Sequence, residues 1–441
     1  MDIKELYDIY RSCGGHVTTD SRTVKGGELF FALKGENFDG NQYALKALEA
    51  GAAYAVVDER AGVEGEKVIP VPDSLEALRD LARYHRENTL VDGERLTVIG
   101  LTGTNGKTTT KELIRSVLAT KYKVTATEGN LNNDIGVPLS LLKIDASTQL
   151  AVIEMGASHP DDIRHLVTVA EPDFGLITNV GKAHLLGFGS FEGVKKAKGQ
   201  LYDYIAEHGK AIFLNADDPD LSVMAEGRGL STIPYGIEAW GVEVLPSDAA
   251  HPYLRMAIPS EEDPDILLGL ETHLVGAYNA ANVLAALAVG RYFDVPLEEA
   301  MQAVADYVPA NSRSQMTRTE RNTLILDAYN ANPTSMAAAL DNFASVLDTN
   351  KVALLGDMRE LGADSVAEHV TIVRKLGAQP ACLVGEEFRK ALEITGKPDT
   401  VSWFATSEDL AAWLKDHPLS DATVLVKGSR GIQMENVVPA L

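Results

Sequence analysis

Hydrophobic positions along the chain fall into short apolar runs separated by segments with helical periodicity. Before residue 90 the apolar runs are 29–33 and 53–57, and the helical segments are 43–50 and 74–88. From residue 96 the alternation becomes regular, with apolar runs at 96–102, 150–154, 174–178 and 211–214. This alternation is typical of a doubly wound, largely parallel sheet. The pattern therefore predicts an α/β protein.

The same pattern divides the chain into three parts. A polar, glycine-containing stretch at 91–95 marks a first boundary. A β-rich stretch at 241–275 and an alanine-rich helix at 279–291 close the second part. After Pro309 come five more apolar runs, each followed by a helical pattern: 323–326, 352–355, 381–384, 401–404 and 423–426. We expect a small α/β domain over 1–93, a central doubly wound domain with an added β region over 94–308, and a Rossmann-like domain over 309–441.

Composition and charge narrow the class of protein. At about 150 residues per domain, 441 residues agree with three domains. The formal net charge of −23 disfavours a nucleic acid or an acidic membrane as partner, because a polyanion would be repelled. Cys13 and Cys382 are too few for a disulfide framework. The start lacks a signal-peptide pattern and no run of 18 apolar residues occurs, so we expect a cytoplasmic protein without membrane insertion.

A glycine-rich stretch between an apolar run and a helical segment is the strongest chemical signal. It consists of Gly103, Thr104, Asn105, Gly106, Lys107, Thr108 and Thr109, and it opens the helical pattern of 107–120. Such a turn points backbone N–H groups at phosphate oxygens, while its lysine reaches the outer phosphates and its hydroxyl can bind Mg²⁺. Only two residues separate its glycines, where the general motif has four. A plain strand-to-helix turn is the less favoured alternative, and the loop by itself names no reaction.

Other polar residues follow the predicted strands. Glu154 ends the run at 150–154, where a carboxylate can hold Mg²⁺ beside a nucleotide, although a helix cap or salt bridge would also explain it. His184 follows a glycine-containing turn after 174–178, which makes a second metal site plausible, but a lone histidine is more often structural. Lysines at 195–198 would usually form a solvated helix face.

Two further groups of polar residues suggest substrate binding. The glycine-bounded loop 129–138 holds three asparagines and an aspartate, which offer many hydrogen-bonding groups without packing value. In the third domain, the polar stretches 327–333, 356–362 and 427–430 each follow an apolar run. Short loops after strands are often polar, but three of them on one sheet favour a binding edge.

Taken together, these motifs resemble the Mur ligase family, the ATP-dependent amide-forming enzymes of bacterial peptidoglycan precursor synthesis. The resemblance covers essentially the whole chain and is carried by Lys198 and by the stretches 102–110, 154–157, 179–184 and 278–282. Within the family, the stretches 129–138, 327–333, 355–362 and 426–430 resemble the branch that joins D-alanyl-D-alanine to UDP-N-acetylmuramoyl-tripeptide. Those two small molecules are the implied partners, and a monomer is expected.

The resemblance also implies roles for individual residues. The implied catalytic residues are Lys107, Glu154, His184 and Lys198, and the implied metal ligands are Thr108, Glu154 and His184. Besides the loop 103–109, ATP is expected to contact Asn279, Asn282, Arg313 and Asp327. The expected UDP-substrate contacts are Ser21, Arg22, Gly35, Asp39, Asn41, Asn130, Asn132 and Asn133. The expected dipeptide contacts are Tyr329, Asn330, Asn332, Asp357, Arg359, Lys427, Ser429 and Arg430.

The implied chemistry is activation of the tripeptide carboxylate by ATP, which gives an acyl phosphate that the dipeptide amine then attacks. ATP and two Mg²⁺ ions are the implied cofactors. In several relatives the lysine that matches Lys198 carries CO₂ as a carbamate, and the resemblance raises that state here without requiring it. Three positions depart from the family pattern: Asn41 for histidine, Ser312 for glycine and Leu326 for the first of two aspartates.

Other functions share parts of these signals. A sister ligase that adds one amino acid, or a folate polyglutamylating ligase, would have the same ATP site and a different third domain. A non-enzymatic nucleotide switch would not require an elaborate amine-binding domain. A dehydrogenase is last, since the third domain lacks a Gly-x-Gly-x-x-Gly turn. Whether the third residue of the tripeptide is lysine or diaminopimelate stays open.

Overall fold

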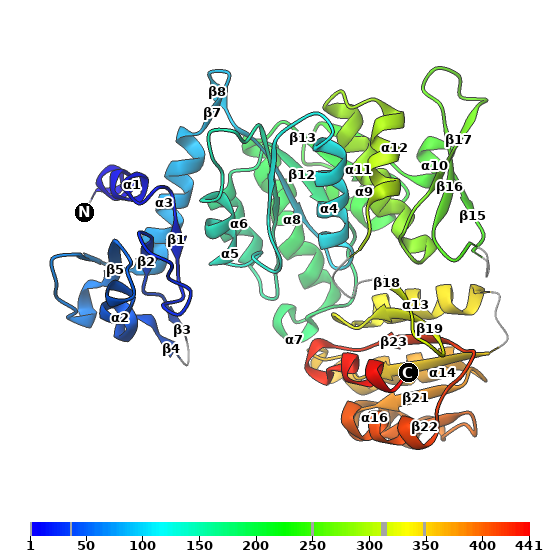
Figure 1. The fold of residues 1–441 in the computed structure, drawn as a ribbon. Helices are drawn as coiled ribbons and strands as arrows, with labels where there is room; N and C mark the ends of the chain where they lie inside the picture. Colours follow the sequence, from blue (N-terminus) through cyan, green and yellow to red (C-terminus); the bar gives the residue numbers. More distant parts are fainter. Residues whose placement is uncertain (1, 36–37, 248–250, 310–314, 347–349) are drawn as a thin grey trace.

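The computed structural model describes residues 2–35, 38–247, 251–309, 315–346 and 350–441. The chain folds into three α/β parts that follow one another along the sequence (Figure 1). In this view the N-terminal part (blue) lies beside the central part, and the C-terminal part (yellow to red) lies below it. Each of the four larger sheets is formed by strands from only one of the predicted ranges 1–93, 94–308 and 309–441. The domain boundaries themselves stay a prediction. No helix in the described ranges is long and apolar enough to cross a membrane.

The N-terminal part is built on a parallel sheet in the order β1-β2-β5-β6. Its strands are β1 (Val17–Thr18), β2 (Leu29–Phe31), β5 (Tyr54–Asp58) and β6 (Val68–Val71). Its helices are α1 (Ile3–Ser12), α2 (Ala44–Glu49) and α3 (Ser74–Asn88), and a short hairpin is formed by β3 (Lys34–Gly35) and β4 (Phe38–Asp39). The prediction of a strand, a helix, a second strand and the long helix 74–88 is confirmed.

Helix α3 joins this part to the central part through buried polar contacts. The guanidinium of Arg86 is fully buried, pairs with Asp173 at 2.9 Å and donates to the backbone carbonyl of Glu171 at 3.1 Å. The ring Nε2 of His85 lies 2.8 Å from the carbonyl of Ile144. Because these contacts sit in a continuous apolar core, the two parts pack as one unit.

The polar stretch at 91–95 is a hairpin rather than an irregular linker. It comprises β7 (Leu90–Val91) and β8 (Glu94–Arg95), which pair antiparallel. Asp92 and Gly93 form the turn with φ of 52° and 87°, the left-handed backbone that a two-residue hairpin requires. An Asp-Gly pair is the sequence signal for this turn, so the hairpin was readable in principle.

The central part is a six-stranded sheet in the order β10-β11-β9-β12-β13-β14, and every pairing in it is parallel. Its strands are β9 (Thr97–Thr102), β10 (Val124–Ala126), β11 (Leu150–Glu154), β12 (Phe174–Ile177), β13 (Ala211–Asn215) and β14 (Thr232–Tyr235). The core on one face is formed with α4 (Lys107–Leu118), α11 (Ala280–Tyr292) and α12 (Leu297–Asp306). The core on the other face is formed with α5 (Gly136–Leu141), α6 (Asp162–Ala170) and α8 (Phe191–His208). The predicted doubly wound sheet is confirmed.

The added β region is a separate antiparallel sheet at the far end of the central part (Figure 1). It consists of β15 (Glu243–Leu245), β16 (Arg255–Pro259) and β17 (Leu267–Glu271). Three short helices complete the central part: α7 (Leu185–Phe188), α9 (Pro219–Ala225) and α10 (Ile237–Trp240).

The C-terminal part has a six-stranded sheet in the order β18-β19-β23-β20-β21-β22. Its strands are β18 (Gln315–Arg318), β19 (Thr323–Asp327), β20 (Lys351–Gly356), β21 (Ala381–Val384), β22 (Val401–Phe404) and β23 (Thr423–Lys427). Among the described residues of this sheet, the edge strand β18 pairs antiparallel with β19, and the other pairings are parallel. The helices are α13 (Pro333–Ser345), α14 (Ser365–Leu376), α15 (Glu386–Thr395) and α16 (Ser407–Asp416). The Rossmann-like prediction is confirmed.

One expected helix is absent from the described C-terminal range. After β23 the chain forms the 3₁₀ helices η5 (Arg430–Ile432) and η6 (Met434–Ala440) instead of an α-helix. Gln433 between them has a left-handed backbone with φ of 55°, and Pro439 cannot donate a helical hydrogen bond. The prediction that every strand here is followed by an α-helix is therefore wrong for β23.

Candidate active site

A cleft of about 880 Å³ lies where the three parts meet. The N-terminal part contributes Leu75, at the start of α3. The central part contributes the phosphate loop and the ends of β11 and β12, and the C-terminal part contributes the loop after β19 and the end of β23. Strands β11, β9 and β12 are direct neighbours, so the polar residues that follow them open onto one edge of the sheet.

The phosphate loop requires both of its glycines. Gly103 has φ of 150° and Gly106 has φ of 79°, values that side chains rarely adopt. A Cβ atom at Gly103 would lie 1.9 Å from Oγ1 of Thr178, and one at Gly106 would lie 2.6 Å from Oδ1 of Asn282. The short spacing between the glycines therefore fits a loop that is packed tightly against its neighbours.

The loop leaves donors for an anion. Helix α4 begins directly after Gly106 without a side-chain cap, so its first-turn N–H groups stand at the cleft. Asn179, at the end of β12, accepts the N–H of Thr104 through its carbonyl at 2.9 Å and that of Asn105 through its side chain at 3.0 Å. The ammonium of Lys107 donates to the carbonyl of Gly103 at 2.8 Å. The arrangement is a preformed phosphate cradle with a lysine folded over it.

Glu154 lies beside the loop as a buried carboxylate. It is 1% exposed and accepts hydrogen bonds from the Thr108 hydroxyl at 3.0 Å and from the Asn132 amide at 2.8 Å. Both of these donors are uncharged groups. A buried carboxylate beside such neutral donors is well placed to bind a cation.

Oxygen ligands of this kind suit Mg²⁺, which keeps several waters and takes few protein ligands. Thr108 and Glu154 fit one such ion beside nucleotide phosphates. No group of three or more histidine, cysteine, aspartate or glutamate side chains in the described ranges gathers into a metal site. The third predicted ligand, His184, contacts the carboxylate of Glu360 through Nδ1.

Lys198 departs from the expectation of a solvated lysine face. Lys195 behaves as expected, since it pairs with Asp220 near the surface. Lys198 is 2% exposed and donates to the carbonyl of Gly103 at 2.9 Å. Desolvation, assisted by the charge of Lys107, holds the pKa of Lys198 well below its ordinary value. The solvated-face interpretation is wrong for Lys198, which lies directly under the phosphate loop.

A smaller pocket of about 100 Å³ adjoins His184. His184 has a left-handed backbone with φ of 51°, and burial lowers its pKa although Glu360 acts in the opposite direction. The pocket is also lined by several of the residues that were expected to contact the dipeptide: Asn330, Asn332, Arg359, Ser429 and Arg430. Two guanidinium groups in a small pocket offer a site for a carboxylate.

Strand register in the C-terminal sheet creates the opposite wall of the cleft. Asp327 on β19 is directly opposite Lys427 on β23, and their side chains pair at 2.5 Å. Asn332, which follows β19, donates to the side chain of Asn105 in the phosphate loop at 2.8 Å. The guanidinium of Arg430 lies 5.5 Å from the ring centre of Tyr329. Two of the three predicted strand ends, 327–333 and 427–430, therefore line the cleft, and the first of them contacts the loop 103–109. The third, 356–362, lines the smaller pocket instead.

Several predicted residues lie elsewhere. Asp357 is 5% exposed and lines neither pocket. Asn41 is 4% exposed, and its amide bonds Asp39 and Asp58. Of the remaining residues expected at the UDP substrate, Asn132 and Asn133 line the cleft. The others lie outside the two pockets: Ser21, Arg22, Gly35, Asp39 and Asn130. Arg313 and Ser312 lie outside the described residues.

The two predicted asparagines near α11 do reach the cleft. Asn279 and Asn282 both line it, and the amide of Asn282 donates to Oδ1 of Asn279 at 2.9 Å. The Thr110 hydroxyl donates to Asn282 at 3.0 Å, which ties α11 to the helix of the phosphate loop.

The cleft also contains residues that the sequence did not suggest. Ser158, His159 and Asp162 line it beyond the end of β11. The Asp162 carboxylate accepts the backbone N–H groups of Ser158 and His159, each at 2.8 Å. Extending the strand-end argument a few residues past Glu154 would have found them. Leu75 belongs to a helix of another domain, and no local signal marks it.

Comparison with known proteins identifies the class. The family "Mur ligase family, catalytic domain" matches residues 15–86, "Mur ligase middle domain" matches 101–290 and "Mur ligase, glutamate ligase domain" matches 312–430. Together with the full-length relatives below, these matches show that the chain belongs to the Mur ligase family, as its motifs predicted.

Particular relatives are similar over nearly the whole chain. The UDP-N-acetylmuramoyl-tripeptide–D-alanyl-D-alanine ligase of Bacillus subtilis is 34% identical, with 96% of this chain and 92% of the relative covered. The ligase of the same name from Escherichia coli is also 34% identical, with 96% and 93% covered. MurF from Acinetobacter baumannii has a TM-score of 0.85 at 28% identity, covering 98% and 97%. MurF from Thermotoga maritima in complex with ADP has a TM-score of 0.82 at 28% identity, covering 96% of each chain.

Proposed function

We propose that the chain joins D-alanyl-D-alanine to UDP-N-acetylmuramoyl-tripeptide at the expense of ATP, in the synthesis of the peptidoglycan precursor. One observation carries the proposal: a single cleft is lined by the phosphate loop, the buried Glu154 and the polar strand ends of the C-terminal part. The names of the relatives from B. subtilis and E. coli support the same reaction.

Each substrate has a place in this proposal. ATP lies on the loop 103–109 and against Asn279, Asn282 and Asp327, which line the cleft, with Arg313 as a further contact. The UDP part reaches the N-terminal part at Ser21, Arg22, Gly35 and Asp39, while Asn130, Asn132 and Asn133 hold the peptide side. Asn41 acts there by fixing Asp39, whose carboxylate accepts its amide at 2.8 Å. The dipeptide enters the smaller pocket beside His184.

The chemistry begins with attack of the tripeptide carboxylate on the γ-phosphorus of ATP. This forms an acyl phosphate and releases ADP. The main barrier is the electrostatic repulsion between two approaching anions. Lys107 and the N–H groups of the loop lower this barrier, because they place positive charge where the phosphoryl group moves. The amine of the dipeptide then attacks the acyl carbonyl, an amide bond forms and inorganic phosphate leaves with the bonding electrons. Closure of the cleft would keep water from the acyl phosphate.

Mg²⁺ would be held by Thr108 and Glu154, where it would neutralise the charge of the transferring phosphoryl group. His184 is a further candidate ligand through Nε2, because its Nδ1 is already used by Glu360. Lys198 has the buried, neutral-favouring environment that carbamate formation requires, since only an uncharged amine attacks CO₂. As a carbamate it would supply a negative group under the loop.

Phosphate release tests the reaction. The purified protein is incubated with ATP, Mg²⁺ and the UDP-linked tripeptide, with D-alanyl-D-alanine, with D-alanine alone or without an amine. We expect phosphate release that depends on the dipeptide and a product heavier by the dipeptide minus water. Release that ignores the dipeptide, or that prefers a single amino acid, would refute this specificity.

A further inference from the structure

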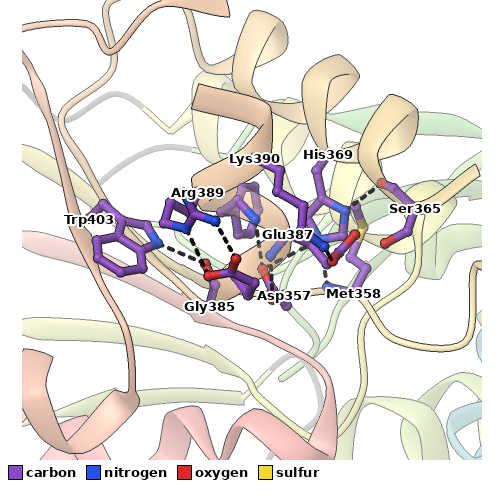
Figure 2. A network of polar contacts seen from close by, with 11 residues as sticks. Asp357, Met358, Ser365, His369, Gly385, Glu387, Arg389, Lys390 and Trp403 are labelled. Atoms are coloured by element: carbon purple, nitrogen blue, oxygen red, sulfur yellow. Dashed lines mark hydrogen bonds and ion pairs between the residues drawn. The ribbon is translucent and has the colours of Figure 1, made fainter. Parts of the chain in front are cut away.

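The loop between β20 and η4 (Gly362–Asp364) is held by three anchors, and two of them, Asp357 and His369, lie away from the two pockets. At the start of α15, the Asp357 carboxylate accepts the N–H of Glu387 at 2.9 Å (Figure 2). It also accepts the N–H of the next residue, Phe388, at 2.9 Å. The N–H of Met358 donates to Nε2 of His369 at 2.9 Å. The hydroxyl of Ser429, on the other side, accepts the next N–H of the loop at 2.9 Å. Backbone groups that are fixed one after another leave this loop little freedom.

His369 can act as an acceptor only in one protonation state. Its ring is fully buried on α14, and its Nδ1 donates to the carbonyl of Ser365 at 2.7 Å (Figure 2). Because a carbonyl cannot donate, the proton lies on Nδ1, and Nε2 keeps the lone pair that Met358 uses. Burial lowers the pKa of His369, while the nearby Asp357 carboxylate, 3.6 Å away, opposes that effect. The neutral ring is therefore the form that the fold selects.

The segment that these anchors hold carries the residues facing the smaller pocket. Arg359 and Glu360 directly follow Met358, and both line that pocket. Glu360 has a left-handed backbone with φ of 64°, an unfavourable conformation for a residue with a side chain. Its carboxylate contacts His184, and its carbonyl accepts the N–H of Leu186 at 3.1 Å. The loop thus joins the C-terminal part to the catalytic edge of the central part.

We propose that His369 is a positioning residue for the incoming amine: through the Met358 N–H it fixes Arg359 and Glu360 against His184 and so shapes the dipeptide pocket. This inference rests on the proposed function, because it takes the smaller pocket to be the dipeptide site. His369 itself contacts neither pocket and acts through the backbone.

Three variants separate positioning from simple packing. His369→Phe keeps a ring of similar size and removes the acceptor, whereas His369→Gln can keep an acceptor near the Nε2 position. Phe388→Leu is the matched control, since its ring packs edge-on against His369 at 4.7 Å and its backbone N–H is untouched. We expect His369→Phe to raise the KM for D-alanyl-D-alanine about tenfold, the scale of one lost hydrogen bond, with the KM for ATP unchanged. His369→Gln should restore most of the difference, and Phe388→Leu should lower stability without this shift.

The outcomes that overturn the inference are distinct from failure of the reaction itself. If the wild-type enzyme is active and the His369→Phe variant keeps the wild-type KM for the dipeptide, the inference is refuted. It is also refuted if the His369→Phe and Phe388→Leu variants both show an equal rise in the KM of every substrate. If the wild-type protein does not use the dipeptide, the proposed function fails instead. Amide hydrogen exchange then still decides the anchoring: the Met358 N–H should exchange slowly in the wild type and much faster in His369→Phe, and equal rates would refute the anchor.

Discussion

Replacing Asp327 by asparagine should destabilise the C-terminal part strongly, because it leaves a buried ammonium without its partner. Lys427 is 1% exposed, and among the residues that the structure describes its ammonium contacts Asp327 at 2.5 Å and the carbonyl of Asn330 at 3.3 Å. Breaking a buried ion pair by removing one partner costs about 3–5 kcal/mol. For unfolding of a domain of this size, that loss lowers the melting temperature by about 10 °C or more.

The assay follows thermal and urea unfolding by tryptophan fluorescence. Trp403 and Trp413 both lie in the C-terminal part, so most of the signal reports its unfolding. The double variant Asp327→Asn with Lys427→Met should recover most of the loss, because it removes the buried charge together with its partner.

A matched control is the exposed pair of Arg389 with Glu386 in the same part, whose side chains are 40% and 56% exposed. Glu386→Gln should leave the stability nearly unchanged, as is usual for a surface pair. The reasoning is wrong if Asp327→Asn costs no more than Glu386→Gln, or if the double variant is as unstable as the single one.

Three further predictions follow from the cleft and its surroundings. Lys107→Ala should abolish dipeptide-dependent phosphate release while the melting temperature stays near that of the wild type, and near-normal turnover would exclude the loop as the phosphate site. Gly106→Ala should raise the KM for ATP about tenfold or more, because the new Cβ would lie 2.6 Å from Asn282 and the φ of 79° disfavours a side chain. An unchanged KM for ATP would contradict the tight packing of the loop. Burial lowers the pKa of His85. Below about pH 6.5 the unfolded chain therefore binds more protons than the folded one, and the free energy of unfolding should fall as the pH falls, by up to about 1.4 kcal/mol per pH unit. His85→Gln should flatten this dependence in urea unfolding at pH 5–7, and an unaltered slope would show that another group causes it.

Local sequence signals predicted the glycine-rich loop and the buried carboxylate that lie together at the cleft. The apolar run, the two glycines and the Lys-Thr pair lie within 97–109, so neighbouring residues alone determine the loop and its helix. Glu154 was found by the same argument, since a carboxylate at a strand end of a parallel sheet points toward the ligand edge.

Burial was the property that local patterns misjudged. Lys198 occurs in a lysine-rich helical segment that is indistinguishable from a solvated face, yet helix α8 packs so that this residue lies under the loop. Asp357 belongs to a polar strand-end loop as expected, but its carboxylate caps α15 from 30 residues away. In both cases the decisive partner lies far along the chain.

The sequence by itself determined the α/β class, the three-part organisation, the phosphate loop and the family, because these depend on periodicity and on motifs a few residues long. Only the tertiary structure decided which strands are neighbours, that Asp327 and Lys427 share a register, that Asn332 meets Asn105 and that His369 holds the loop of Arg359. Strand order and burial result from packing between distant segments, and the free energy of that packing is a property of the whole core. A local pattern therefore predicts which groups can do chemistry, whereas the fold decides which of them meet.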